Sequence, residues 1–289
     1  MFEHFEKRQF SNASITINYV QGGSGPPLLL LHGYPQSHVM WHKIAPTLAE
    51  KFTVVASDLR GYGDSSKPPT DDRHEPYSKR ATANDQVALM KSLGFDRFLL
   101  VGHDRGGRVG HRLTLDHPQA VQKLVTMDIA PTHTMYTTTD MEFATAYYHW
   151  FFLIQPYDLP EQMIGYDAQG FLKKKFKQWG RDSDAFTEEA IVEYLRCFTP
   201  ETIHASCEDY RASASIDLEH DEVDIAKGNK ITCPFLCLWG EKGFVGHKYD
   251  VVTEWQKWAT DVRGYGLPCG HYLPEEAPEE TLRALLDFL

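Results

Sequence analysis

The segment Gly102-His103-Asp104-Arg105-Gly106 places a carboxylate between two glycines. It follows the apolar run Phe98–Val101 and precedes a helical pattern, so the sequence predicts a sharp turn from a strand into a helix. Glycines permit such a turn, and its strain pushes the central side chain out above the sheet. A carboxylate presented in this way can attack carbon without first losing a proton. The plainer interpretation is that Asp104 only caps the helix.

A histidine and a second acid could complete a catalytic group around this carboxylate. Cys269-Gly270-His271 follows the last predicted strand, where a histidine can act as a general base toward water. We interpret Cys269 as a packing residue. The histidine needs an acid that orients its ring. Asp128 stands at the end of the run Lys123–Met127, where ligand-facing groups collect in parallel sheets.

Glu241 is the other candidate for this acid. It follows the predicted strand Phe235–Trp239. Many α/β-hydrolases carry the acid here, in the pattern Trp-Gly-x-x-Asp, but this chain has Gly243 at the aspartate position. We therefore predict that Asp128 orients His271.

The order nucleophile, acid, histidine along the chain is that of the α/β-hydrolases, and the Gly-x-Asp-x-Gly turn matches their nucleophile elbow. In that fold the loop after an earlier strand supplies one backbone N–H of an oxyanion hole. Here His32-Gly33-Tyr34-Pro35 follows Leu28–Leu31. We expect the two donors to be the amides of Tyr34 and Arg105.

Two arginines follow the nucleophile in the first turn of the helix. Arg105 and Arg108 are three residues apart and share one helix face. Cations are disfavoured at this end of a helix, which points to a functional reason for both. Two guanidinium groups beside a nucleophile suit a carboxylate substrate held bidentately. The alternative is that they only keep Asp104 ionised; Arg112, further along the helix, is interpreted as structural.

An aspartate nucleophile favours a particular chemistry. A carboxylate attacks sp³ carbon that carries a leaving group, which produces an ester of Asp104. His271 can then activate water against the ester carbonyl. Carbon–halogen bonds and epoxides suit this pair, whereas carboxyl esters do not.

The rest of the chain alternates strands and helices, which predicts an α/β fold with a mostly parallel central sheet. The predicted strands are Ser14–Val20, Leu28–His32, Phe52–Ala56, Phe98–Gly102, Lys123–Asp128, Phe235–Trp239 and Asp261–Tyr265. The predicted helices include Val39–Glu50, Thr82–Leu93 and Arg105–His117.

One long segment interrupts the alternation. About a hundred residues between Asp128 and Phe235 are rich in aromatics and helix formers, without a convincing buried strand. We predict a core domain of residues 1–132 and 232–289 and an inserted helical cap of residues 133–231. The basic run KKKFK (Lys173–Lys177) is interpreted as a solvated helix face.

Composition limits the classes of partner. The chain has 289 residues, of which 42% are hydrophobic and 24% charged, as is typical of a folded protein with a large core. The net charge of −11 disfavours a nucleic-acid partner, because phosphate binding needs a basic face.

Other features concern location and cofactors. The start MFEHFEKRQF carries charges throughout, and apolar runs such as Leu28–Leu31 are far shorter than the ~20 residues of a membrane span. We therefore expect neither a signal peptide nor a membrane partner. Five scattered cysteines indicate reduced thiols in a cytoplasm. Cys233 and Cys237 have no nearby histidine cluster, so no metal is predicted. The chemistry needs water but no cofactor.

The chain resembles the fluoroacetate dehalogenases of the α/β-hydrolase superfamily. The resemblance rests on GHDRGGR (Gly102–Arg108), HGYPQ, MDIAP, YHW and CGHYLPEE, and it covers essentially the whole chain. It implies Asp104 as the nucleophile, His271 as the base and Asp128 as its partner. It also implies that Arg105 and Arg108 bind a substrate carboxylate, and that the protein forms a homodimer, as is common in this family.

The same resemblance implies a halide site in the cap. His149, Trp150 and Tyr210 would bind the departing halide, and Trp179 would line the pocket. Fluoride is small and strongly hydrated, so N–H and O–H donors must replace part of its water shell. Tyr34 is a departure, because phenylalanine is common after His-Gly; we count it among the pocket residues.

Three functions stay open from the sequence. The first is hydrolytic dehalogenation of a short 2-haloacid, fluoroacetate or a chlorinated acid. The second is epoxide hydrolysis with the same triad, for which Tyr147, Tyr148 and Tyr210 are candidate acid donors. Arg105 argues against it, because a neutral epoxide has no use for that charge. A non-enzymatic scaffold of this fold is disfavoured, because all three triad residues are present.

Overall fold

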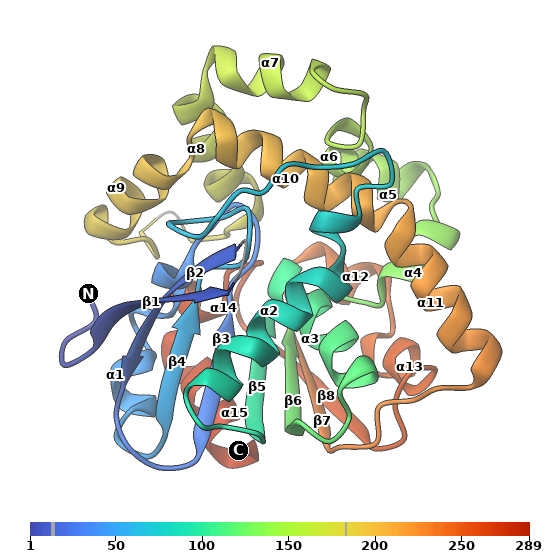
Figure 1. Cartoon of the computed structure of the whole chain (residues 1–289). Helices are drawn as coiled ribbons and strands as arrows, with labels where there is room; N and C mark the ends of the chain where they lie inside the picture. The colour runs from blue at the N-terminus through green and yellow to red at the C-terminus, as the bar shows by residue number, and fades with distance from the viewer. Residues whose placement is uncertain (13–14, 183) are drawn as a thin grey trace.

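The computed structural model describes residues 1–12, 15–182 and 184–289. An eight-stranded sheet in the order β1-β2-β4-β3-β5-β6-β7-β8 forms its centre (Figure 1). The strands are β1 (Glu6–Asn12), β2 (Ile15–Gly22), β3 (Pro27–Leu31), β4 (Thr53–Ser57), β5 (Phe98–His103), β6 (Val121–Met127), β7 (Phe235–Gly240) and β8 (Val262–Leu267).

The sheet is mostly parallel, as predicted. Every pairing from β4 through β3 to β8 is parallel, whereas β2 pairs antiparallel with both β1 and β4. The central strand β5 is buried along its whole length, which explains its continuous apolar sequence. The sequence analysis missed β1, because this exposed edge strand carries mostly polar side chains and has no apolar period.

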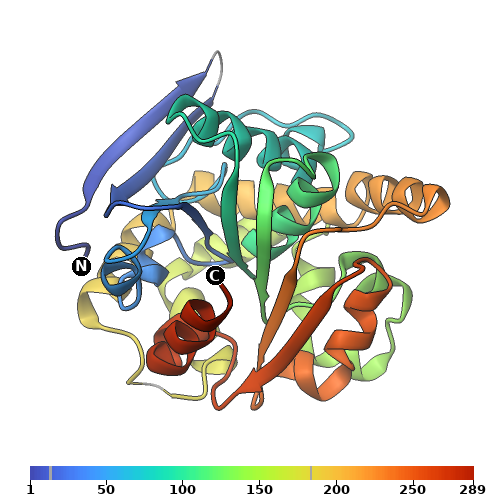
Figure 2. The ribbon, with the colours of Figure 1, turned by 90° about the horizontal axis from the view of Figure 1, so that it is seen from below.

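Helices cover both faces of the sheet. Figure 2 shows α2 and α3 on one face and α1 and α15 on the other. The helices outside the segment between β6 and β7 are α1 (Ala45–Leu48), α2 (Lys79–Ser92), α3 (Arg105–Asp116), α12 (Phe244–Lys248), α13 (Val251–Gln256), α14 (Leu273–Glu276) and α15 (Pro278–Phe288). None of the helices in the described ranges is long and apolar enough to cross a membrane.

The predicted helix Val39–Glu50 is wrong. The chain forms a 3₁₀ turn at His38–Trp41 and then the separate short helix α1. Pro46 is the physical reason, because proline lacks the N–H that a continuing helix needs but fits the first turn of a new one.

The segment between β6 and β7 is helical in its described residues and lies above the sheet (Figure 1). Its helices are α4 (Thr132–Thr137), α5 (Met141–Ala146), α6 (Tyr148–Phe152), α7 (Leu159–Tyr166), α8 (Ala168–Trp179), α9 (Glu188–Cys197), α10 (Pro200–Ser213) and α11 (Ile216–Lys227). The interpretation of KKKFK as a solvated face is wrong for one residue, because Lys175 is buried. Its long side chain lies against aromatic rings on α6 and α8.

Two glycines make the turn between β5 and α3 possible. A Cβ on Gly102 would lie 2.4 Å from the carbonyl oxygen of Gly106. A Cβ on Gly106 would lie 2.4 Å from the carbonyl oxygen of Leu31 in the neighbouring strand β3. Both contacts involve backbone atoms that cannot move aside easily. The helix therefore approaches the sheet as closely as it does only with glycine at these positions.

This close approach predicts the effect of one methyl group. Gly106→Ala should lower the free energy of unfolding by about 1–3 kcal/mol, because the backbone must shift to admit the Cβ. Gly165→Ala in α7 is the matched control, since nothing lies within 4 Å of its Cβ position. In urea denaturation, the free energy of unfolding of Gly165→Ala should equal that of the wild type or be slightly higher. Equal unfolding free energies for the two variants would contradict the packing argument.

Candidate active site

Asp104 occupies the strained turn between β5 and α3. Its φ of 45° and ψ of −114° lie outside the regions that non-glycine residues favour. The side chain is buried, and its Oδ1 accepts a hydrogen bond of 2.9 Å from the backbone N–H of Tyr34. Gly33 permits this approach, because a Cβ there would lie 2.5 Å from the Cβ of Asp104. One carboxylate oxygen is thus held by the loop after β3, as the oxyanion-hole prediction requires; the role of the Arg105 amide stays a prediction.

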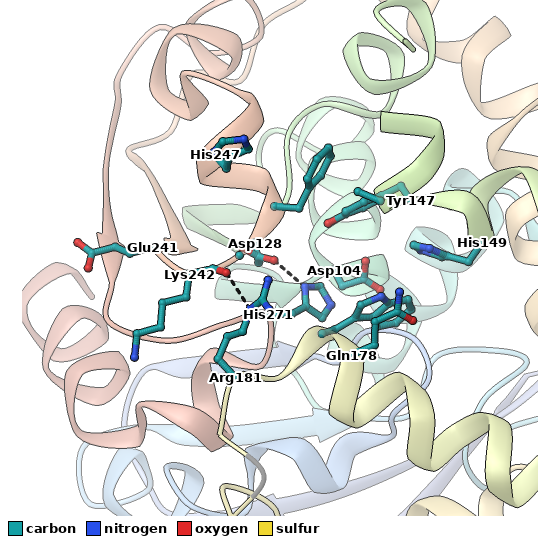
Figure 3. Close-up of a pocket in the computed structure, with 14 residues that line it drawn as sticks. Asp104, Asp128, Tyr147, His149, Gln178, Arg181, Glu241, Lys242, His247 and His271 are labelled. Atoms are coloured by element: carbon teal, nitrogen blue, oxygen red, sulfur yellow. Dashed lines mark hydrogen bonds and ion pairs between the residues drawn. The ribbon is translucent and has the colours of Figure 1, made fainter. Parts of the chain in front are cut away.

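His271 forms a short hydrogen bond with the predicted acid. Its Nδ1 donates to Oδ2 of Asp128 over 2.6 Å, and the backbone N–H of Gly240 donates to the other oxygen over 3.0 Å. Figure 3 shows the imidazole between the carboxyl groups of Asp128 and Asp104. With Nδ1 engaged, Nε2 is the ring atom that can accept a proton.

Gly243 explains why the acid comes from the end of β6. A Cβ at position 243 would lie 3.4 Å from Oδ1 of Asp128, so the carboxylate of Asp128 occupies the space beside this glycine. Glu241 points away from His271 in Figure 3. The geometry therefore favours Asp128 over Glu241 as the group that orients the base.

The two catalytic candidates have shifted pKa values. Burial opposes the charge of His271, but the hydrogen bond and negative charge of Asp128, together with the charge of Asp104, outweigh it and raise the pKa of His271 above 6.5. Burial also raises the pKa of Asp104, yet the neighbouring His271, His103, Arg105 and Arg108 lower it overall. Asp104 is therefore a carboxylate at neutral pH although it is buried.

A cavity of about 560 Å³ opens onto Asp104 and His271 (Figure 3). Its walls are formed by residues at the C-terminal ends of the strands, in the segment between β6 and β7, and in the stretch after β7. They are Asp104, Asp128, Ala146, Tyr147, His149, Gln178, Trp179, Arg181, Glu241, Lys242, Gly243, Phe244, His247 and His271. Of the residues predicted to bind substrate, His149 and Trp179 lie on these walls.

The other predicted binding residues are not among those that form the walls. The guanidinium group of Arg105 stacks on the ring of Tyr210 at 4.2 Å, and that of Arg108 stacks on Trp150 at 4.7 Å. The ring of Tyr34 meets that of Tyr210 edge to face at 5.5 Å. All five side chains are buried.

The hydrogen bonds of the two arginines differ from the expectation that they hold a substrate carboxylate bidentately. The Nε of Arg105 donates to Asp209 over 2.7 Å, and its Nη2 donates to the backbone oxygen of Asp209 and to Ser213. The Nη1 of Arg108 donates to Ala130 and Thr132. Among the nitrogens of these two guanidinium groups, Nη1 of Arg105 and Nε of Arg108 are buried without a partner. Neither guanidinium therefore presents a free two-pronged fork.

The three predicted halide ligands come together. The ring of His149 lies 5.8 Å from that of Tyr210, and Trp150 lies 6.3 Å from Tyr210. Among the described residues, the Nδ1 of His149, the hydroxyl groups of Tyr210 and Tyr34, and the Nε1 of Trp179 are buried without hydrogen-bond partners. Buried polar groups are rarely left unpaired, so this concentration points to a polar ligand.

Sequence reasoning missed several residues near the site. Asp209 accepts hydrogen bonds from Arg105 and from Tyr62, and it forms an ion pair with Lys79. Its only signal in the sequence was its position beside Tyr210. Gln178 and Arg181 on the cavity wall lacked a motif altogether. Arg112 binds Asp116, Asp221 and Asp224, which fits its structural interpretation.

Comparisons with known proteins identify the family of this chain. The alpha/beta hydrolase fold family matches residues 26–278, so the chain is an α/β hydrolase. A fluoroacetate dehalogenase from Burkholderia sp. is 46% identical over 291 residues, covering 100% of this chain and 95% of that protein. The chain belongs to the fluoroacetate dehalogenase family of α/β hydrolases.

Two further proteins are similar to this chain over nearly its whole length. A soluble epoxide hydrolase from Corynebacterium sp. (strain C12) is 35% identical and covers 94% of this chain and 93% of its own length. A crystal structure from Nostoc sp. PCC 7120, provisionally described as an α/β hydrolase, is 61% identical with a TM-score of 0.98, covering 100% of this chain and 99% of that one.

The contact between His271 and Asp128 predicts a measurable pKa change. In Asp128→Asn the hydrogen bond to a charged acceptor and its negative charge are lost while the burial remains, so the pKa of His271 should fall. NMR titration of the imidazole would measure it. Glu241→Gln is the control and should leave the pKa of His271 unchanged. A fall in Glu241→Gln but not in Asp128→Asn would contradict the assignment.

Proposed function

We propose that this protein converts fluoroacetate and water into glycolate and fluoride, as a hydrolytic dehalogenase of short 2-haloacids. Family membership makes it a hydrolase acting on carbon–halide bonds. The observation that carries the finer proposal is a buried, charged Asp104 beside two buried arginines, each with one unpartnered guanidinium nitrogen. This arrangement suits a small substrate that carries its own carboxylate.

In the first step, Asp104 displaces the halide. Oδ1 is held by the Tyr34 amide, so Oδ2 is the oxygen free to attack C2 of fluoroacetate from the side opposite fluorine. A C–O bond forms as the C–F bond breaks, and the bonding electrons leave with fluoride. The products are an Asp104 ester and a halide ion. His271 does not act in this step.

In the second step, water hydrolyses the ester. The Nε2 of His271 takes a proton from water, and the hydroxide adds to Cγ of Asp104. Negative charge then develops on Oδ1, where the amide of Tyr34 already donates and where we expect that of Arg105 to donate. Collapse of this adduct breaks the bond between Cγ and Oδ2, and Oδ2 takes the proton from His271 to become the hydroxyl oxygen of glycolate. The carboxyl group of Asp104, which now holds the oxygen from water, loses its remaining proton to solvent, and its carboxylate is restored.

Two sets of donors would hold the substrate. We propose that the substrate carboxylate bridges Nη1 of Arg105 and Nε of Arg108, one oxygen on each. The halide would lie among His149, Trp150 and Tyr210, with Trp179 and Tyr34 closing the pocket. Burial and nearby cations keep the pKa of His149 well below 6.5, so its imidazole is neutral and can donate only through an N–H.

Epoxide hydrolysis is the second candidate. The observation that favours it is Tyr147, whose side chain lies on the wall of the cavity, where a phenol could protonate an epoxide oxygen. The similarity to a soluble epoxide hydrolase points the same way. The two arginines favour the haloacid, because an epoxide offers them no negative charge.

Halide release distinguishes the candidates. The purified protein, incubated with fluoroacetate, should release free fluoride that an ion-selective electrode detects. Chloroacetate and a small neutral epoxide serve as parallel substrates. Chloride without fluoride would restrict the activity to weaker carbon–halogen bonds. Diol formation without any halide would overturn the dehalogenase proposal in favour of epoxide hydrolysis.

The pKa of His271 sets the expected pH dependence. A general base must be neutral and His271 acts only in ester hydrolysis, so kcat should fall at low pH when that step limits the rate; in the free enzyme the pKa of His271 lies above 6.5. Because kcat/KM covers the steps up to halide loss, it should not follow this base. Esterification removes the negative charge of Asp104, which is one cause of the raised pKa of His271. The pH at which kcat falls should therefore lie below the pKa of His271 in the free enzyme when ester hydrolysis limits the rate. Stopped assays of product across pH test both. A flat profile of kcat from about pH 5 to about pH 9 would contradict this role of His271.

A further inference from the structure

Lys175 is a buried cation in an aromatic surrounding. It lies on α8 and is 1% exposed. Its Nζ lies 4.2 Å from the ring centre of Tyr148, 4.8 Å from that of Trp179 and 5.2 Å from that of Phe171. It donates a hydrogen bond of 2.8 Å to the hydroxyl of Tyr148 and a longer one of 3.4 Å to the Oε1 of Gln178.

No carboxylate balances this charge among the ion pairs of the described residues. Arg105 and Lys79 differ, since Arg105 pairs with Asp209 and Lys79 pairs with Asp209 and Asp217, whereas Arg108 bonds only to neutral groups. An unpaired buried charge is costly, and burial lowers the pKa of Lys175 to about 8. The side chain is therefore mostly charged at neutral pH, at a position where a neutral side chain of similar length would be easier to bury.

Lys175 lies directly behind the predicted halide donors. Trp179 separates it from His149, whose ring is 4.6 Å from that of Trp179. After burial, the charge of Lys175 is the largest cause that lowers the pKa of His149. Its positive potential therefore reaches the imidazole that lines the cavity. A cation on the face of an indole also makes the indole N–H a stronger donor.

The first chemical step moves one negative charge from Asp104 onto the halide. The donors proposed around the halide are neutral, so they supply dipoles but no net charge. We propose that Lys175 is an electrostatic positioning residue, whose charge behind Trp179 and His149 stabilises the halide ion as it leaves. This inference rests on the proposed function and adds a residue that determines how well the enzyme tolerates a poor leaving group.

The test compares leaving groups in matched variants. Lys175→Met keeps the chain length and removes the charge, whereas Lys174→Met makes the same change at an exposed position of the same helix. We expect Lys175→Met to lower kcat for fluoroacetate about tenfold, as expected for loss of one charge at moderate distance. The loss should be smaller for chloroacetate and smallest for bromoacetate, where carbon–halogen cleavage limits the rate least. Lys174→Met should match the wild type.

Two further measurements separate this role from a structural one. Lys175→Arg restores the charge and should recover most of the fluoroacetate rate. Chloride should inhibit Lys175→Met more weakly than the wild type, because one of the positive charges near the halide site has been removed. Thermal unfolding checks that each variant is folded.

The outcomes are distinct. Equal losses for all three haloacetates, or no loss for any of them, would overturn the role of Lys175 while the wild-type activity still supports the proposed function. A wild-type protein that releases no halide from any of the three would overturn the proposed function, and this inference with it.

Discussion

A charged carboxylate held in the interior, that of Asp104, is the constraint on which the rest of the site depends. Burial alone would raise its pKa, but the neighbouring His271, Arg105 and Arg108 lower the pKa below its usual value. The carboxylate must also keep one oxygen free for reaction. The strained φ of 45° and the amide of Tyr34 achieve this, since they fix Oδ1 and leave Oδ2. The glycines of the turn and of the loop after β3 follow from the same requirement, because each lets backbone approach where a Cβ would collide.

The cations that keep Asp104 charged are themselves buried, and most of them need partners. Asp209 on α10 pairs with both Arg105 and Lys79, so the segment between β6 and β7 is connected to the nucleophile through ion pairs as well as through aromatic packing. Breaking such a buried pair leaves an uncompensated charge, which is far more costly than losing the pair as a whole. The same network leaves one guanidinium nitrogen of each arginine without a partner. These two nitrogens are the donors that we propose for the carboxylate of the substrate.

The sequence predicted those parts of the fold that depend on local pattern. Continuous apolar runs such as β3 and β5 identify parallel strands, and the spacing around Asp104 identifies the turn between β5 and α3. The order of Asp104, Asp128 and His271 was also readable, because each follows a strand. β1 was missed because an exposed edge strand carries no apolar period. Asp209 and Lys175 could not be placed, since their roles depend on which side chains the folded chain brings to them. In sequence, a lysine within a basic run is indistinguishable from its solvated neighbours.

A single turnover in water labelled with ¹⁸O tests the central claim most directly, namely that Asp104 itself forms a bond to the substrate. With enzyme in excess over fluoroacetate, the oxygen transferred to carbon comes from Asp104 and is replaced by solvent oxygen during ester hydrolysis. Mass spectrometry of the peptide that contains Asp104 should therefore show ¹⁸O in its carboxylate, and the hydroxyl group of the glycolate should be unlabelled. Labelled glycolate with an unlabelled Asp104 would mean that water attacks the substrate directly, and it would contradict the account.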